Sequence, residues 1–163
     1  MNRLDTSPRR TCGRRAGLVL SALAAVLVLG GCSAPVQLPD PQVDDATRTT
    51  CSALVADAPA TLLGSPRRAT TGSLAVAWGD PPITLACGGP KPAGLTATSP
   101  CLEVNGVGWW SQDGTTGTIF TTVGRAVYVQ VGVPNAYGNS GDALAELAPI
   151  VSRHDTLLRP CAG

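Results

Sequence analysis

The hydrophobic and polar positions along the chain divide it into three stretches with different patterns. Residues 16–29 form an uncharged apolar run that directly follows a segment with five arginines. Residues 33–46 contain three prolines and three acidic residues and have no apolar periodicity. Beyond them, short apolar runs alternate with turns rich in glycine and proline. The pattern predicts a signal segment over 1–31, a tether over 32–46 and one folded domain over 47–163.

Two stretches of this domain have apolar residues at helical spacing. The first lies between Thr47 and Pro59, where the repeat is carried by Cys51, Leu54, Val55 and Ala58. Asp44 or Asp45 is suited to cap its start. The second starts near Asp142, with Ser140 or Asp142 as the cap, and contains Leu144, Leu147, Ile150 and Val151. Pro149 predicts a kink in this second helix.

The remaining apolar runs predict strands joined by tight turns. Residues 74–78 and 83–87 flank the turn sequence Gly79-Asp80-Pro81-Pro82. Asn105-Gly106 predicts a two-residue type I′ hairpin, because both residues tolerate positive φ. In that register Val104 pairs with Val107, and Leu102 pairs with Trp109. A second hairpin joins residues 118–122 to residues 126–133 through Gly124-Arg125, and the valines of its second strand alternate with other residues.

These elements predict the fold class. A helix, about six short strands and a second helix are typical of an α+β domain. We expect an antiparallel sheet of about five or six strands, with the N-terminal and the C-terminal helix packed on one face.

The N-terminal pattern predicts export and lipidation. Fourteen apolar residues span roughly 21 Å as a helix, which is too short for the ~30 Å core of a bilayer. Leu29-Gly30-Gly31-Cys32 resembles a bacterial lipobox, so we expect Cys32 to carry fatty-acid chains such as palmitate. A plain signal peptide that ends near a cysteine is the alternative. Two arginine pairs suggest a twin-arginine export signal as a further alternative. Neither pair is followed by the apolar pattern of such a signal, so export through the Sec pathway is favoured.

Lipidation at Cys32 predicts a location at the cell membrane, anchored on its extracytoplasmic face. Two or three acyl chains anchor a protein stably, whereas a single chain holds it only marginally. The fourteen residues from Ser33 to Ala46, if extended, would hold the domain up to roughly 40 Å from the bilayer.

The four cysteines of the domain predict two disulfides, because the count is even in an exported chain. Three connectivities are possible. We expect Cys51–Cys161 to join the two ends of the domain and Cys87–Cys101 to close a short loop. A zinc site is the competing reading, but the chain has no C-x-x-C pair and its single histidine, His154, is remote from three of the thiols. We therefore expect no metal and no cofactor.

Charge excludes nucleic acid as a partner. The whole chain has a net charge of +1, but the residues after Gly31 hold seven basic and ten acidic side chains. An exported product with a net charge of −3 lacks the basic surface that nucleic acids require.

The candidate site residues lie around the predicted turns. Exposed tryptophans beside Asn and Asp can stack on sugars or anchor a peptide. The binding candidates are Trp78, Asp80, Asn105, Trp109, Trp110, Asp113 and Arg125. Consecutive Trp109 and Trp110 must point to opposite faces of a strand. The competing reading makes the tryptophans core filler, since the chain has one Phe and two Tyr. Arg125 is also placed to form a surface pair with Asp113 or Asp80, a kind of pair that usually contributes less than about 1 kcal/mol.

A hydrolase is the alternative to a binding module. His154 adjoins Asp155, but it is better explained as a cation at the end of a helix, and Gly138-Asn139-Ser140-Gly141 is not a nucleophile elbow. A carboxylate pair such as Asp80 and Asp113 requires a separation of roughly 5 to 9.5 Å to cleave a glycan, which a sequence does not give. We therefore predict a non-catalytic binding or accessory module for an envelope protein or glycan, which uses the surface near the Asp80 and Asn105 turns.

Three motifs carry a resemblance to a known family. They are W-G-D-P-P-I-T-L-x-C-G (Trp78 to Gly88), V-N-G-V-x-W (Val104 to Trp109) and G-R-x-V-Y-V (Gly124 to Val129). With the tether, they resemble the actinobacterial lipoprotein family catalogued as domain of unknown function 3515. The resemblance covers essentially all of Cys51 to Cys161. It implies an envelope location and carries over no catalytic residue.

Overall fold

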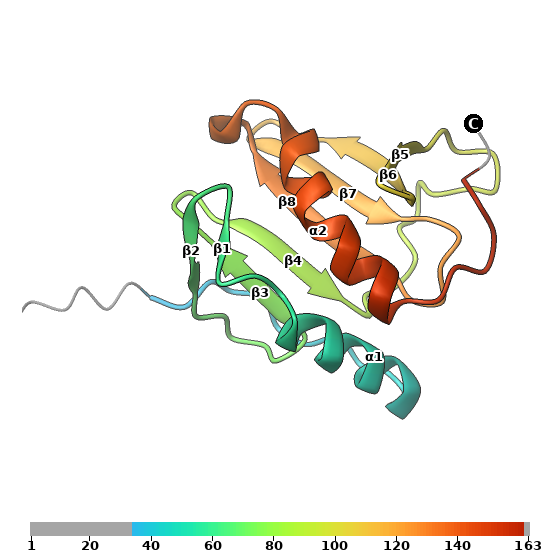
Figure 1. Ribbon diagram of the computed structural model, residues 1–163, viewed down its shortest axis with the longest axis horizontal. Helices are drawn as coiled ribbons and strands as arrows, with labels where there is room; N and C mark the ends of the chain where they lie inside the picture. The colour runs from blue at the N-terminus through green and yellow to red at the C-terminus, as the bar shows by residue number, and fades with distance from the viewer. Residues whose placement is uncertain (1–33, 162–163) are drawn as a thin grey trace, which may run out of the picture. The chain divides into compact units, whose positions relative to one another are not determined.

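Two helices and an eight-stranded antiparallel sheet form the part of the chain that the structure, a computed structural model, describes: residues 34–161 (Figure 1). The helices are α1 (Asp45–Ala56) and α2 (Ser140–His154), and a short 3₁₀ turn, η1 (Asn135–Tyr137), precedes α2. The strands are β1 (Thr61–Leu62), β2 (Ser65–Arg68), β3 (Ala75–Trp78), β4 (Ile83–Cys87), β5 (Leu102–Val104), β6 (Val107–Asp113), β7 (Gly117–Thr122) and β8 (Val129–Pro134). Their order across the sheet is β1-β2-β3-β4-β8-β7-β6-β5.

The α+β class and the antiparallel sheet are confirmed, but the predicted five or six strands are too few. The missed strands are β1 and β2, which pair as a hairpin at one end of the sheet. Leu63 and Gly64 form its turn with φ of 48° and 73°. Strand β1 has two residues and β2 contains a proline and two arginines, so neither shows the alternating apolar pattern that reveals a strand.

Both helices are capped by side chains that precede them. Asp44 accepts a hydrogen bond of 2.7 Å from the backbone N–H of Thr47, so α1 begins at Asp45. For α2 the cap is Asn139, which accepts from the N–H of Gly141 at 3.1 Å, and not Ser140 or Asp142 as the sequence predicts. Asn, like Ser and Asp, is a strong N-cap residue, so the pattern placed this boundary within a few residues.

The core lies on one face of the sheet, where both helices pack. The alternating residues Ile83, Leu85 and Cys87 of β4 are fully buried there, as are valines of β8. Helix α1 contributes Cys51 and Leu54, and α2 crosses the sheet beside it with six buried side chains (Figure 1). The other face of β4 presents Thr84 and Ala86, which are only partly buried. The helices therefore leave the second face of the sheet uncovered.

The Asn105-Gly106 hairpin is confirmed. The two residues have φ of 48° and 77°, as a type I′ turn requires, and Val104 pairs with Val107. The second hairpin is confirmed as a pair of antiparallel strands, β7 and β8, but β8 begins at Val129 and not at residue 126. The Thr122 hydroxyl accepts from the N–H of Val129 at 2.9 Å, so a side chain takes the place of a backbone partner where the ladder would continue.

The four domain cysteines form two disulfides, but the predicted pairing is wrong. Cys51 pairs with Cys87 and Cys101 pairs with Cys161, with Cα–Cα distances of 5.4 and 6.1 Å. Helix α1 lays Cys51 over the end of β4, where Cys87 points into the core. The C-terminal segment returns past β6, so that Gly108 lies against Cys161. The pairing is set by these tertiary contacts and not by the nearness of each cysteine to a chain end.

The segment predicted to be a free tether lies along the domain from Ala34 onward. The backbone of Val36 forms hydrogen bonds of 2.8 and 3.0 Å with residues 69 and 71. Asp40 accepts from the hydroxyl and N–H of Ser73 and from the N–H of Leu74, and these bonds, led by the Ser73 hydroxyl, lower the pKa of Asp40. A stand-off of roughly 40 Å is therefore excluded for this segment. The predicted signal segment and the lipidation site Cys32 lie outside the described residues.

Neither helix in residues 34–161 combines the length and hydropathy needed to cross a bilayer.

Candidate functional site

A groove of about 580 Å³ lies on the face of the sheet that the helices leave uncovered. Its floor is one row of side chains across four neighbouring strands, because Thr84 pairs with Gly132, Gly132 with Ile119, and Ile119 with Gln112. The Pro81–Pro82 turn forms one wall, and the turn between β6 and β7 forms another. The groove is therefore an open concave surface built on a rigid sheet.

The floor of the groove is low because glycine occupies its centre. A Cβ atom at Gly132 would lie 2.7 Å from the Thr84 hydroxyl, so any larger residue would crowd this row. Beside it Ile119 is an aliphatic side chain that is 48% exposed. Thr84, Gln112 and Thr116 add neutral hydrogen-bonding groups to a lining that also includes Thr118 and Asp113 beside apolar residues and glycines. This mixture is typical of small binding sites, where a few polar groups orient a ligand on an apolar surface.

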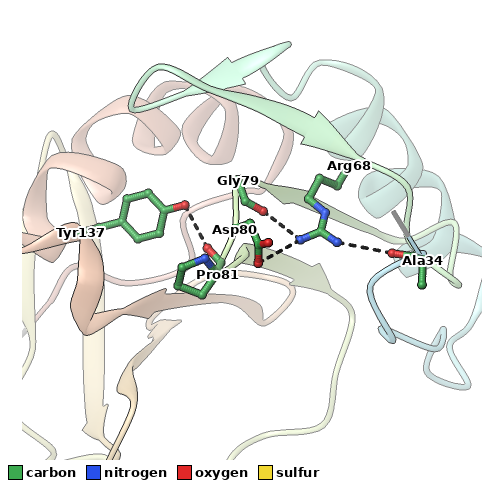
Figure 2. Close-up of polar contacts among 6 residues, drawn as sticks. All are labelled: Ala34, Arg68, Gly79, Asp80, Pro81 and Tyr137. Carbon is green, nitrogen blue, oxygen red and sulfur yellow. Dashed lines mark hydrogen bonds and ion pairs between the residues drawn. The ribbon is translucent and has the colours of Figure 1, made fainter. Parts of the chain in front are cut away.

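The Pro81 wall is held from both sides, as Figure 2 shows. The Tyr137 hydroxyl donates to the Pro81 carbonyl at 2.9 Å. Behind the turn, the Arg68 guanidinium donates to the carbonyls of Gly79 and Ala34 at 3.0 and 3.4 Å, and lies 3.6 Å from the Asp80 carboxylate. Arg68 thus connects the groove wall to the first described residue of the chain.

Part of the outer face is covered by the loop between β4 and β5. Trp110 lies there, half-buried, and a Cβ atom at Gly94 would come within 3.1 Å of its ring. Leu95 in the same loop is buried. The loop therefore covers the outer face around Trp110, beside the groove.

The structure separates the two turns that the sequence placed in one binding surface. Asp80 lies beside the start of β4, at the end of the sheet where Asp113 pairs with Thr118. Asn105 and Arg125 lie at the opposite end, beyond the first residue of β6 and near the end of β4. The predicted surface that joins the Asp80 and Asn105 turns is therefore wrong. Asp113 lines the groove and Asp80 flanks it.

Asn105 and Arg125 are tied to helix α2. The Asn105 amide donates to the carbonyl of Ala145 at 3.2 Å. The Arg125 guanidinium donates to the carbonyls of Asp155 and Gly106 at 2.6 and 3.1 Å. Arg125 does not pair with Asp113 or Asp80, which lie at the other end of the sheet. Both side chains position loops against the helix, and Asn105 is exposed as well.

Two of the three tryptophans are core residues. Trp78 is fully buried and its indole N–H donates to the carbonyl of Pro59 at 2.8 Å. Trp109 is 1% exposed, and Trp110 points to the opposite face, as strand geometry predicts. The interpretation of the tryptophans as core residues is thus correct for Trp78 and Trp109, which are too buried to contact a ligand.

His154 ends α2, as predicted, and connects it to α1. Its Nε2 lies 2.8 Å from a carboxylate oxygen of Asp57, which also accepts from Arg153 at 3.0 Å. Hydrogen bonds from His154 and then Arg153 lower the pKa of Asp57. Among the described residues, no hydroxyl or thiol hydrogen-bonds to His154, and no cluster of three potential metal ligands is found.

Asp155 is a buried carboxylate that the sequence pattern did not indicate. It is 1% exposed, one oxygen accepts from the N–H of Val127 at 3.1 Å, and the other has no partner. Burial raises the pKa of Asp155 more than the hydrogen bond and the charge of Arg125 lower it. Its position directly after an amphipathic helix was the only sequence signal, and that position is normally exposed.

The pKa of Asp57 is lowered and the pKa of Asp155 is raised, so substitutions of these two residues should change stability with pH in opposite directions. The folded state binds the proton of Asp155 more tightly than the unfolded state, so above roughly pH 4 ionisation of Asp155 lowers stability as pH rises. Asp155→Asn should therefore gain stability relative to the native protein between roughly pH 4 and 7. Asp57→Asn should lose stability relative to the native protein as the pH rises toward roughly 4, and by a constant amount above it, because the folded-state pKa of Asp57 lies below the unfolded-state pKa. Urea unfolding at a series of pH values measures both, and parallel curves for the two variants would refute the assignment.

A family model described as a protein of unknown function (DUF3515) matches residues 16–157. The chain belongs to this family. The assignment to domain of unknown function 3515 drawn from the three motifs is confirmed, and the match covers every strand and both helices of this DUF3515 protein. No curated protein and no solved structure matches it significantly.

Proposed function

We propose that this DUF3515 protein is a lipid-anchored envelope protein whose domain binds an envelope protein or glycan without catalysing a reaction on it. The observation that carries the proposal is the groove, where four neighbouring strands present Thr84, Gly132, Ile119 and Gln112 in one open row. Asp113 is the only ionisable residue among the described residues that line the groove, and its side chain alternates with Gln112 and so points to the other face of the strand. A surface of this kind offers shape and hydrogen bonds for recognition.

The location of the proposed anchor supports a role close to the membrane. Only Ser33 separates Cys32 from Ala34, whose carbonyl is bound by Arg68. Two extended residues span at most about 7 Å. Acyl chains on Cys32 would therefore hold the Arg68–Asp80 side of the domain, and with it the Pro81 wall of the groove, near the bilayer surface. A partner of the groove would then be a membrane-proximal segment.

A site-specific cross-linking experiment in intact cells tests this function. A photoreactive amino acid at Ile119 should yield a defined covalent adduct, whereas the same amino acid at Leu158 should not. Both side chains are exposed, at 48% and 68%, but only Ile119 lines the groove. Cys32→Ser should abolish fatty-acid labelling and reduce the adduct. Identical adducts from both positions, or none from Ile119, would contradict groove binding.

The alternative is a hydrolase that uses Asp80 and Asp113 as a carboxylate pair, since both lie at the groove end of the sheet. In the structure Asp80 forms an ion pair with Arg68, and Asp113 accepts a hydrogen bond of 2.9 Å from Thr118. The binding proposal predicts that Asp80→Asn leaves the adduct of the Ile119 probe in place. A hydrolase would instead accumulate uncleaved substrate in that variant.

A further inference from the structure

Strand β6 is longer than the edge strand that covers it. Strand β5 pairs only with Val107, Gly108 and Trp109, whereas β7 pairs with β6 as far as Asp113. The chain cannot extend β5 toward the groove, because Cys101 is bound to Cys161 and Pro100 lacks an N–H. Within residues 34–161, β6 from Trp110 to Asp113 therefore has a neighbouring strand on one side only.

The hydrogen-bond pattern of the sheet identifies which backbone groups face outward. The Gly108 carbonyl accepts from Val123, so Gly108 and the alternate residues Trp110 and Gln112 bond toward β7. The N–H and C=O groups of Ser111 and Asp113 consequently point to the vacant side. Ser111, Gln112 and Asp113 are exposed, and no described loop pairs with them. Ser111 and Asp113 thus each present one donor and one acceptor, and the two residues lie about 6.8 Å apart along this open edge.

This edge carries one charged residue, Asp113, but otherwise lacks the features with which proteins usually block strand pairing. It contains no proline or lysine, and its register with β7 continues without a bulge through four consecutive residue pairs beyond Trp109. It also borders the groove, because Gln112 and Asp113 belong to both. A strand added beside Ser111 would place alternate side chains next to Gln112 and the groove floor.

We propose that the ligand of this edge is an extended peptide segment of a partner protein, which adds a strand along Ser111–Asp113. Backbone groups at a two-residue repeat match the donors and acceptors of a peptide, whereas a glycan has no such repeat. Asp113 is the charged residue of this edge, so a lysine or arginine in a peptide strand paired beside it complements the charge. The inference rests on the proposed function and specifies its partner as a basic, extended peptide.

A proline substitution tests the edge without breaking the sheet. Ser111→Pro removes an N–H that bonds to no strand in the free protein, and proline is tolerated at such edge positions. Ser111→Ala keeps the N–H and serves as the matched control. The probe is a synthetic peptide chosen from a random linear library by its binding to the full chain in mild detergent. Ser111→Pro should weaken its binding about fivefold, as expected for one lost backbone hydrogen bond, and Ser111→Ala should leave it unchanged.

Amide hydrogen exchange provides a second readout that needs no substitution. In the free protein the amides of Ser111 and Asp113 should exchange fast, while those of Trp110 and Gln112 are protected by β7. Bound peptide should protect Ser111 and Asp113. The selected peptides should carry a basic residue, and Asp113→Asn should reduce their affinity more at low than at high salt.

Three results would overturn the inference. They are a library that yields no binder, equal binding by the Pro and Ala variants, and Ser111 and Asp113 amides that stay unprotected in the complex. Should Ser111→Pro fail to fold, the exchange pattern of the native protein decides. Groove adducts from Ile119 that contain a glycan, or a second copy of this chain paired along β6, would also overturn it while leaving a binding function in place.

Discussion

Trp78→Ala is expected to lower the free energy of unfolding by about 3–5 kcal/mol. Trp78 is fully buried in the core cluster, and its truncation leaves a large cavity and removes the donor to the Pro59 carbonyl. A domain of this size has a total stability of roughly 5–15 kcal/mol, so the loss is a large share of it. Urea unfolding monitored by circular dichroism measures the change.

Trp110→Ala is the matched control, because it removes the same side chain from the outer face. Trp110 is half-buried under the β4–β5 loop and outside the core cluster. Its substitution should cost clearly less than that of Trp78. Trp78→Phe retains most of the ring volume and provides a folded variant if the alanine variant does not fold. Equal losses at Trp78 and Trp110 would contradict the assignment of one to the core and the other to the outer face.

Features that depend on neighbouring residues could be predicted from the sequence. The Asn105-Gly106 turn fixes its own register, because positive φ at both residues admits one short hairpin geometry. The helices and strand β8 follow from the spacing of their buried residues. The opposite orientation of Trp109 and Trp110 follows from strand geometry alone.

Features that depend on distant contacts could not be predicted. The linker looks like a tether because it is rich in proline, yet Val36 and Asp40 bind residues about thirty positions further along the chain. Strand β2 forms although it contains Pro66, since β3 supplies its partner. The groove combines residues from four strands, and only Asp113 of its lining carried a recognisable signal.

In the candidate site, too, neighbouring residues determine the local turns, whereas distant contacts determine which turns share a surface. Asp80 and Asn105 both occupy polar turns, and sequence analysis grouped them because such turns are exposed and chemically alike. Strand direction separates them, since Asp80 precedes β4 and Asn105 precedes β6, two strands that start at opposite ends of the sheet. Order across the sheet, which the sequence does not encode locally, therefore decides which side chains share a surface.

Replacement of both Cys51 and Cys87 by alanine is expected to destabilise the domain by about 4 kcal/mol. The bond closes a loop with a sequence separation of 36, and the chain-entropy model gives a loss of this size on its removal. Both sulfurs lie in the buried cluster that joins α1 to β4, so packing is lost as well. The single variant Cys51→Ala also tests the pairing, because it should free a thiol at Cys87 and not at Cys161. Alkylation of the unreduced protein followed by mass spectrometry identifies the free thiol.

The Cys101/Cys161 double alanine variant separates loop entropy from core packing. Its separation of 60 is longer, so loop entropy alone makes this bond the more stabilising of the two. Cys101 and Cys161, however, are only partly buried and join a loop to the C-terminal segment, whereas Cys51 and Cys87 are fully buried. We expect the Cys51/Cys87 variant to lose more stability. The reverse order would mean that the contacts of α1 hold it on the sheet without the disulfide.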